Sequence, residues 1–297
     1  MEDAVEGARR RTIALPGGEM AALAFGPRRD PDVIFVHANG FNARTYRSIL
    51  GPLGDQLAVL AVDMRGHGRS TLPAPPTWRR NWNDIRDDLV HLLDTLDAPP
   101  LVMAGHSMGG TCSLLAAARR PDRVRGLVLF DPVIMPRSFS FWAAMPWSSG
   151  VAWRSSPIAQ GALKRRAEFD SREAAVKAYT GRGAFKTWAP EMLADYVADG
   201  FKDRPDGKVE LACAPAWEAS NFGAQGQDPW PAVGQVRAPI RVLRAEHAST
   251  CRIGTGFDFA RRGPHVTIQT IEGTSHFLPM ERPDLVRKAL LAAAGPG

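Results

Sequence analysis

The 297-residue sequence has few cysteines and no long uninterrupted apolar run. Its three cysteines, Cys112, Cys213 and Cys251, lie far apart and lack metal-ligand spacing, so we expect small buried side chains in a reducing compartment and no metal site. No run approaches the roughly 20 apolar residues that a membrane-spanning helix needs. Residues 1–20 also lack a signal-peptide pattern. The sequence therefore predicts a cytoplasmic protein with no membrane partner.

Lysine is scarce, whereas arginine is abundant. Only six of the 37 basic residues are Lys, and the formal net charge is +6. Arginine binds phosphate well, so nucleic acid has to be considered as a partner. The arginines nevertheless form short scattered groups, with no basic stripe and no nucleic-acid-binding motif. We expect a small-molecule substrate and no nucleic acid, and the sequence leaves open whether the chain forms a homo-oligomer.

Short apolar runs alternate with helical patterns along most of the chain. A hairpin is predicted from residues 11–15 and 20–25, around a Pro-Gly-Gly turn. Buried strands are predicted at 33–36, 57–62, 101–104, 126–130, 240–243 and 266–271. Helices are predicted at 84–96, 108–119 and 284–293. This alternation is typical of an α/β fold with a mostly parallel, doubly wound sheet.

The alternation stops between residues 136 and 236. This interval contains helical patterns, such as 171–179 and 190–197, but no convincing buried strand. It is too long for a connecting loop. We interpret it as an inserted helical cap, so the predicted domains are a core of residues 1–135 and 237–297 and a cap of residues 136–236.

A candidate nucleophile lies in the sequence Gly105-His106-Ser107-Met108-Gly109, directly after a predicted strand and before a predicted helix. A G-x-S-x-G pattern at such a turn exposes its serine, because small residues on either side let strand and helix approach closely. Serine needs a base within hydrogen-bond reach. Of the seven histidines, we favour His276, which follows the last predicted strand and so lies at the same edge of the sheet.

These motifs, the loop His37-Ala38-Asn39-Gly40-Phe41 and the segment 63–70 (DMRGHGRS) together resemble the α/β-hydrolase superfamily over nearly the whole chain. The resemblance implies a nucleophile, an acid and a base in the chain order Ser, Asp or Glu, His. It also implies an oxyanion hole made of the backbone N–H of Met108 and a second one from the 37–41 loop. We assign the second to Asn39, with Phe41 as the alternative. Such a site requires no metal and no organic cofactor.

The acid departs from the commonest pattern of the superfamily. In most members it is an Asp after the sixth parallel strand, but residues 245–248 are Ala-Glu-His-Ala, so Ala248 occupies that position. Some members, haloalkane dehalogenases among them, carry the acid one strand earlier, where this sequence has Asp131. We predict that Asp131 orients His276. Glu246 is the alternative acid.

Six of the eight tryptophans lie in the predicted cap, at positions 142, 147, 153, 188, 217 and 230. We predict an apolar substrate pocket lined by five aromatic side chains: Phe41, Phe139, Trp142, Trp147 and Phe277. The predicted function is a serine hydrolase that cleaves carboxylic esters with apolar groups through a Ser-His-Asp triad and an acyl-enzyme. A carbon–carbon bond hydrolase or a cofactor-free perhydrolase would use the same triad, and a non-catalytic ligand-binding protein is a further alternative.

Overall fold

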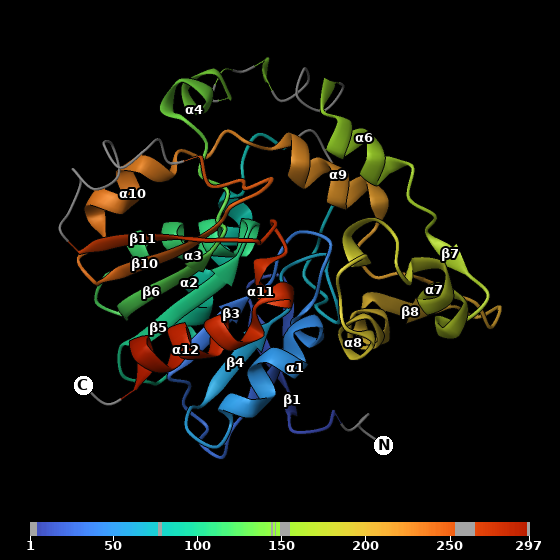
Figure 1. Cartoon of the computed structure of the whole chain (residues 1–297), viewed down its shortest axis with the longest axis horizontal. Helices are drawn as coiled ribbons and strands as arrows, with labels where there is room; N and C mark the ends of the chain where they lie inside the picture. Colours follow the sequence, from blue (N-terminus) through green and yellow to red (C-terminus); the bar gives the residue numbers. More distant parts are fainter. Residues whose placement is uncertain are drawn as a thin grey trace.

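The central element of the fold is an eight-stranded sheet (Figure 1). The computed structural model describes residues 5–76, 79–143, 145, 147–148, 155–252 and 265–295. Within this part of the chain the strand order is β1-β2-β4-β3-β5-β6-β10-β11. The strands are β1 (Arg9–Leu15), β2 (Gly18–Phe25), β3 (Val33–Val36), β4 (Val59–Val62), β5 (Leu101–His106), β6 (Val124–Phe130), β10 (Ile240–Ala245) and β11 (Val266–Ile271).

The strand directions confirm the predicted mostly parallel sheet. The hairpin β1–β2 is antiparallel, and β2 is antiparallel to β4. From β4 to β11, every neighbouring pair is parallel. All residues of β3 and β4 are buried, because helices cover both faces of a parallel sheet and leave no face for water.

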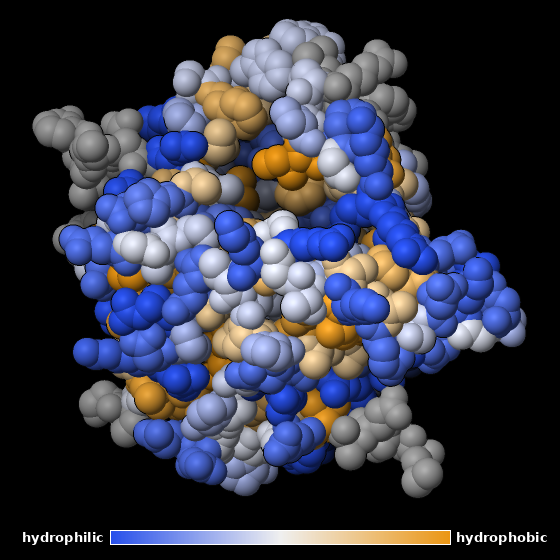
Figure 2. Space-filling model, turned by 45° about the vertical axis from the view of Figure 1, so that its right-hand side comes forward, coloured by the Kyte–Doolittle hydropathy of each residue, from blue (hydrophilic) through white to orange (hydrophobic). Residues whose placement is uncertain are grey.

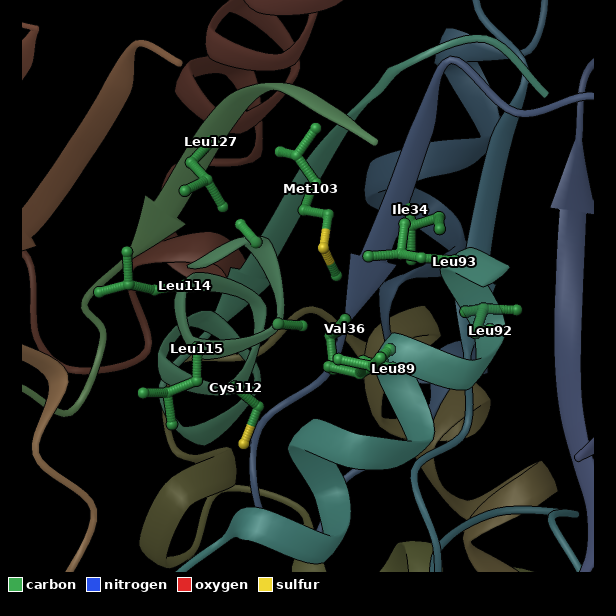
Figure 3. Packing of buried hydrophobic residues seen from close by; sticks show 14 of the residues in the cluster. Ile34, Val36, Leu89, Leu92, Leu93, Met103, Cys112, Leu114, Leu115 and Leu127 are labelled. Atoms are coloured by element: carbon green, nitrogen blue, oxygen red, sulfur yellow. The ribbon is translucent and has the colours of Figure 1, made fainter. Parts of the chain in front are cut away.

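Alternate residues of each strand pack against different helices. Ile34 and Val36 face one side, where they join α2 (Asn83–Thr95) and α3 (Met108–Arg119) in one apolar cluster (Figure 3). Val33 and Phe35 face the other side and join α1 (Arg47–Leu50) and α12 (Pro283–Ala294). Burying one such side chain contributes about 1.5–3 kcal/mol. The period of two in the strands thus produces two cores, one on each face of the sheet.

The segment between β6 and β10 contains short helices, as predicted, and also a small sheet that was not predicted. The helices in its described residues are α4 (Arg137–Ala143), α6 (Pro157–Leu163), α7 (Arg172–Tyr179), α8 (Pro190–Gly200), α9 (Pro215–Gly223) and α10 (Pro229–Gln235). A three-stranded antiparallel sheet joins β7 (Glu168–Phe169), β9 (Val209–Leu211) and β8 (Phe201–Asp203). Strands this short give no recognisable apolar run. We call residues 136–236 the insertion.

Ion pairs attach α8 of the insertion to the sheet domain. Asp195 and Asp199 are each only 3% exposed. Arg10 donates two hydrogen bonds to Asp199, of 2.8 and 2.9 Å, and Arg47 binds Asp195 at 2.8 Å. Arg44 adds a contact of 3.2 Å to Asp195. Buried carboxylates require such partners, so part of the arginine excess has a structural role.

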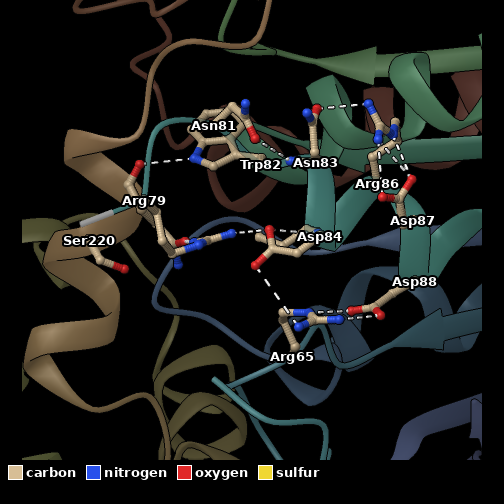
Figure 4. Close-up of polar contacts among 12 residues, drawn as sticks. Arg65, Arg79, Asn81, Trp82, Asn83, Asp84, Arg86, Asp87, Asp88 and Ser220 are labelled. Carbon is tan, nitrogen blue, oxygen red and sulfur yellow. Dashed lines mark hydrogen bonds and ion pairs between the residues drawn. The ribbon is translucent and has the colours of Figure 1, made fainter. Parts of the chain in front are cut away.

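A second set of polar contacts attaches α9 to the segment that precedes α2 (Figure 4). The indole N–H of Trp82 donates to the carbonyl oxygen of Asn221 at 2.9 Å. The guanidinium of Arg79 binds the side chains of Asn221 and Asp84 and lies 4.2 Å from the ring centre of Trp217. The insertion is therefore fixed to the sheet domain at two separate places.

No helix in the described ranges combines the length and the apolar composition that crossing a bilayer would require. Cys112, Cys213 and Cys251 are all buried. Trp153 of the predicted aromatic group lies outside the described residues.

Candidate active site

Ser107 occupies a sharp turn between β5 and α3. Its backbone angles, φ 55° and ψ −122°, lie in a region that residues other than glycine rarely adopt. A Cβ on Gly109 would lie 2.3 Å from the carbonyl oxygens of Val36 and His37, and one on Gly105 would lie 2.6 Å from Gly109. Only glycine fits at these two positions, so the turn presents Ser107 at the carboxyl edge of the sheet.

His276 and Asp131 meet Ser107 at this edge. His276 lies in the loop between β11 and α11 (Leu278–Glu281), and Asp131 directly follows β6. The Nδ1 atom of His276 is 2.6 Å from Oδ2 of Asp131, and its Nε2 atom is 3.0 Å from Oγ of Ser107. An ionised carboxylate can only accept, so Nδ1 carries the proton and Nε2 is left to accept from the serine hydroxyl.

Asp131 is fully buried, and its carboxylate is held by several donors. Oδ1 accepts from the N–H of Ala245 at 3.0 Å and from the hydroxyl of Ser249, and Oδ2 accepts from the N–H of Thr250 at 3.0 Å. Burial opposes ionisation, but the hydrogen bonds from His276, Ser249 and Ala245 keep the pKa of Asp131 below its usual value. The group therefore remains a carboxylate that faces the imidazole.

Glu246, the alternative acid, lies elsewhere. Its carboxylate accepts from the N–H of Gly273 at 2.8 Å and lies 3.3 Å from His247. Its side chain is 42% exposed. Ala248, at the position where most members of the superfamily have their acid, lines the cavity described below. Of the two acids, only Asp131 contacts His276 in the described part of the chain.

In the loop after β3, the backbone N–H groups of Ala38, Gly40 and Phe41 already have acceptors. Ala38 donates to the hydroxyl of Tyr46 at 3.2 Å, Gly40 to Nε2 of His67 at 3.0 Å, and Phe41 to the carbonyl of Ala38 at 3.1 Å. In the described ranges, no acceptor is found for the N–H of Asn39. The Asn39 side chain is occupied by α9, since it donates to the carbonyl of Glu218 at 3.0 Å.

The N–H of Met108 belongs to the first turn of α3 and has no intrahelical acceptor. The structure thus leaves Met108 and Asn39, rather than the alternative Phe41, with N–H groups free to bind a ligand near Ser107. Both residues line the cavity described below.

A chain of buried hydrogen bonds connects this loop with the loop of His276. The hydroxyl of Tyr46, which accepts from Ala38, lies 2.7 Å from Nδ1 of His106. The Nε2 atom of His106 lies 2.7 Å from the backbone carbonyl of His276. A carbonyl only accepts, so Nε2–H of His106 donates and Nδ1 accepts from Tyr46. Burial lowers the pKa of His106 to about 3, which keeps it neutral. The sequence does not predict this series of hydrogen bonds, because the residues that form it are far apart along the polypeptide.

Above Ser107 lies a cavity of about 770 Å³ between the sheet domain and the insertion. Ser107, Met108, Asn39 and His276 line it. In Figure 2, hydrophobic side chains gather at a hollow in the upper half of the molecule. No cluster of three or more His, Cys, Asp or Glu side chains in the described part of the chain is arranged to bind a metal ion.

Three of the five predicted pocket aromatics line this cavity, namely Phe41, Phe139 and Phe277. Trp142 and Trp147 differ from the prediction, since neither is among the described lining residues. They contact each other, with ring centres 5.9 Å apart, and Trp147 is 57% exposed. The reason is that α4 turns Phe139 rather than Trp142 toward the cavity, and that Trp147 lies beyond the end of α4.

A polar cluster in the cavity wall was not predicted. It comprises Arg165, which follows α6, with Tyr179, Tyr196 and Glu218 from α7, α8 and α9. Arg165 donates to the carboxylate of Glu218 and to the hydroxyl of Tyr196, the latter at 2.8 Å. Burial alone would lower the pKa of Arg165, but Tyr196 and Glu218 raise it well above its ordinary value. In the sequence, Arg165 is one of several arginine pairs and carries no distinguishing pattern.

Comparisons with known proteins agree with this architecture. The sequence model of the Alpha/beta hydrolase family matches residues 33–289. The chain is 24% identical, over 88% of its length and 86% of the relative's, to 2-(acetamidomethylene)succinate hydrolase from Mesorhizobium japonicum. It is also 24% identical, over 90% of each chain, to 3-oxoadipate enol-lactonase 2 from Acinetobacter baylyi. The crystal structure of E-2-(acetamidomethylene)succinate hydrolase superposes with a TM-score of 0.78 at 23% identity, covering 97% of this chain and all of the other.

Proposed function

Because the chain belongs to the alpha/beta hydrolase family, we propose that it is a serine hydrolase that cleaves carboxylic esters with an apolar group through an acyl-enzyme. One observation carries the proposal. Asp131, His276 and Ser107 form a continuous hydrogen-bonded series, with contacts of 2.6 and 3.0 Å, at the floor of a cavity that is lined largely by apolar side chains.

In the first step, Oγ of Ser107 attacks the ester carbonyl carbon while Nε2 of His276 takes the hydroxyl proton. The imidazolium that forms is stabilised by the carboxylate of Asp131, which does not itself take the proton. Negative charge develops on the former carbonyl oxygen, and the N–H groups of Met108 and Asn39 are available to bind it. When the tetrahedral intermediate collapses, the proton on Nε2 passes to the leaving alcohol.

In the second step, water attacks the acyl-enzyme. His276 takes a proton from the water, and the same two N–H groups bind the second oxyanion. Collapse of this intermediate releases the carboxylic acid and returns the proton to Ser107. Every proton moves between Ser107, His276 and the reactants, so the sequence of steps balances without a cofactor.

The relatives support hydrolysis as the general reaction, and they differ in substrate. One is named as the hydrolase of a succinate derivative and another as an enol-lactonase. An esterase from Mycobacterium tuberculosis shares the fold, with a TM-score of 0.71. An ester substrate lies within this range of acyl chemistry, and Phe41, Phe139 and Phe277 support an apolar group in it.

Labelling with a fluorophosphonate tests the proposal. The wild-type protein should be modified at Ser107 and should lose its esterase activity, because only an activated serine reacts with this probe. Ser107→Ala should prevent labelling. Ser156→Ala is the matched control, since Ser156 lines the same cavity but caps α6. Absence of labelling in folded wild-type protein would contradict a serine hydrolase and favour a ligand-binding protein on the same scaffold.

A further inference from the structure

The position of Arg165 indicates a class of substrate. We propose that the substrate carries a carboxylate in addition to its ester bond, and that Arg165 binds this carboxylate inside the cavity. This proposal rests on the hydrolase function proposed above. The substrate would then be a monoester that is apolar along its chain and anionic at one end. Arg165, Tyr179 and Tyr196 of the insertion would select it, and the sheet domain would cleave it.

Arg165 lies close to the loop that follows β3. Gly40 adjoins Asn39 in the loop after β3, and its φ of +76° favours glycine. A Cβ at Gly40 would lie 2.6 Å from Oε1 of Glu218 and 3.5 Å from Nη1 of Arg165. The guanidinium therefore lies beside the loop that holds the N–H of Asn39, so a short ligand can reach both groups.

Arg165 and the two tyrosines beside it present a set of hydrogen-bond donors to the cavity. Tyr179 and Tyr196 accept from Nη2 of Arg165, at 3.5 and 2.8 Å, so each hydroxyl keeps its own proton for another acceptor. The Nε–H of Arg165 has no acceptor in the described part of the chain, and the side chain is 23% exposed. Converging N–H and O–H donors with a fixed positive charge match the planar acceptor pair of a carboxylate.

Glu218 holds Arg165 in place through an ion pair. Its Oε2 atom accepts from Nη1 of Arg165, whereas its Oε1 atom packs against Gly40. A carboxylate in the cavity must therefore bind next to an existing negative charge, which weakens binding. It follows that neutralising Glu218 should strengthen selectivity for an anionic substrate, whereas neutralising Arg165 should abolish it.

A second arginine, Arg252, lines the cavity near Thr250, on the side of Asp131. Its side chain is exposed, and it has no ion-pair partner among the described residues. An exposed charge is screened by water and salt, so its influence on a bound carboxylate should be small. Arg252→Gln is therefore a matched control, because it removes the same charge from the same cavity.

The experiment measures kcat/KM for two pairs of esters by titrating the acid released. In the first pair, monomethyl adipate carries a carboxylate on the acyl side, and methyl hexanoate is its neutral counterpart. In the second pair, the butyrate ester of 4-hydroxybutanoate carries the carboxylate on the alcohol side, and butyl butyrate is its counterpart. Within each pair, kcat/KM for the carboxylate ester is divided by kcat/KM for its neutral counterpart. The fraction of folded enzyme cancels in this ratio, so a partly unfolded variant remains informative.

We expect the wild-type enzyme to have a higher kcat/KM for the ester that carries the carboxylate in at least one pair. Arg165→Gln and the charge-balanced double variant Arg165→Gln/Glu218→Gln should lower that ratio about 10- to 100-fold, the range for losing a hydrogen bond to a charged group. Glu218→Gln should raise it several-fold, and Arg252→Gln should leave it within about threefold.

The proposal would be overturned if the ratio of kcat/KM within each pair stayed unchanged in both Arg165 variants. It would also be overturned if this ratio fell in the Glu218→Gln enzyme, or if it fell only in the Arg252→Gln enzyme. Fluorophosphonate labelling separates this failure from failure of the hydrolase function. If the enzyme is labelled but the ratios do not differ between variants, only the proposed carboxylate of the substrate is contradicted. If the folded enzyme is not labelled, the proposed hydrolase function itself is contradicted.

Discussion

The sheet domain is organised around strands that are buried on both faces, whereas the insertion adds buried ion pairs to its apolar contacts. Apolar side chains on both faces of the sheet, such as Ile34 and Phe35, pack against helices from distant parts of the chain. The insertion joins these apolar clusters through α8 and α10, and it also binds to the sheet domain through Arg–Asp pairs at α8 and through Arg79 and Trp82 at α9. Apolar packing resists changes of side-chain volume, whereas a buried ion pair resists the removal of either charged partner. Ser107, His276 and Asp131 lie on the sheet domain, whereas Arg165, Tyr179 and Tyr196 of the cavity wall lie on the insertion, so the proposed catalysis and the proposed substrate selection belong to different regions.

The same contrast holds for single side chains. Ser107 and Asp131 lie at the ends of buried strands, and positive φ angles of 55° and 42° show that the surrounding structure imposes their positions. Arg165 instead follows a seven-residue helix, α6, and is held by contacts to three other side chains. A change at a strand end should therefore affect catalysis, and a change at Arg165 should affect the choice of substrate.

The largest effect is expected at the strand ends. Asp131→Asn should lower kcat about 10³- to 10⁴-fold, because the amide no longer selects the tautomer of His276 that accepts the serine proton. Glu246→Gln should change kcat by less than about threefold, since Glu246 is bound to Gly273. Steady-state kinetics with one ester measures both. If kcat fell equally in the folded Asp131→Asn and Glu246→Gln variants, the proposed distinction between a buried acid at a strand end and an exposed acid in a loop would be wrong.

Acid should weaken the sheet domain through a buried neutral histidine. His67 donates from Nδ1 to the carbonyl of Arg65 at 2.9 Å and accepts at Nε2 from Gly40, so it has no room for a second proton. Burial lowers its pKa to about 4, whereas the unfolded chain has the ordinary value near 6.5. The unfolded state therefore binds the proton first, and the stability from this group is full above about pH 6.5 and falls toward pH 4.

Denaturant titration at pH 7 and pH 5 checks this effect. The free energy of unfolding should fall by about 2 kcal/mol more in the wild type than in His67→Gln, which keeps an acceptor for Gly40 but does not titrate. Parallel pH curves for the two proteins would show that His67 is not a source of the acid sensitivity.

The smallest effect compares two tyrosines, one in each region. Tyr46→Phe removes the hydroxyl between Ala38 and His106 and should lower kcat about tenfold with KM within about twofold, because the loop of His276 loses a support. Tyr179→Phe should instead raise KM for a carboxylate ester a few-fold and leave kcat nearly unchanged. Replacing Tyr46 by His, which can still hydrogen-bond, should restore part of kcat. If Tyr46→Phe altered KM alone, the hydrogen-bonded chain would have no positioning role.

The predicted elements agree best with the structure where a local sequence pattern decides the fold of the segment. The strand at 33–36 and the helix at 108–119 match β3 and α3 in their bounds, because buried parallel strands are continuously apolar and Pro121 stops the helix. The small sheet of the insertion was missed, since two- and three-residue strands have no pattern. The sequence predicts Trp142 and Trp147 in the pocket, because composition does not say which way a side chain on α4, or in the segment after it, points.

The sequence predicts the fold class and the side chains of Ser107 and His276, because the motifs at strand ends and the alternation of strands and helices are local patterns. It left two acids, Asp131 and Glu246, as alternatives. Only the tertiary structure brings Asp131 to 2.6 Å from His276 and joins Arg165 with Tyr179, Tyr196 and Glu218 in one cavity wall. The physical reason is that contacts between residues far apart in the chain depend on how helices and strands pack, and one-dimensional patterns do not encode that packing.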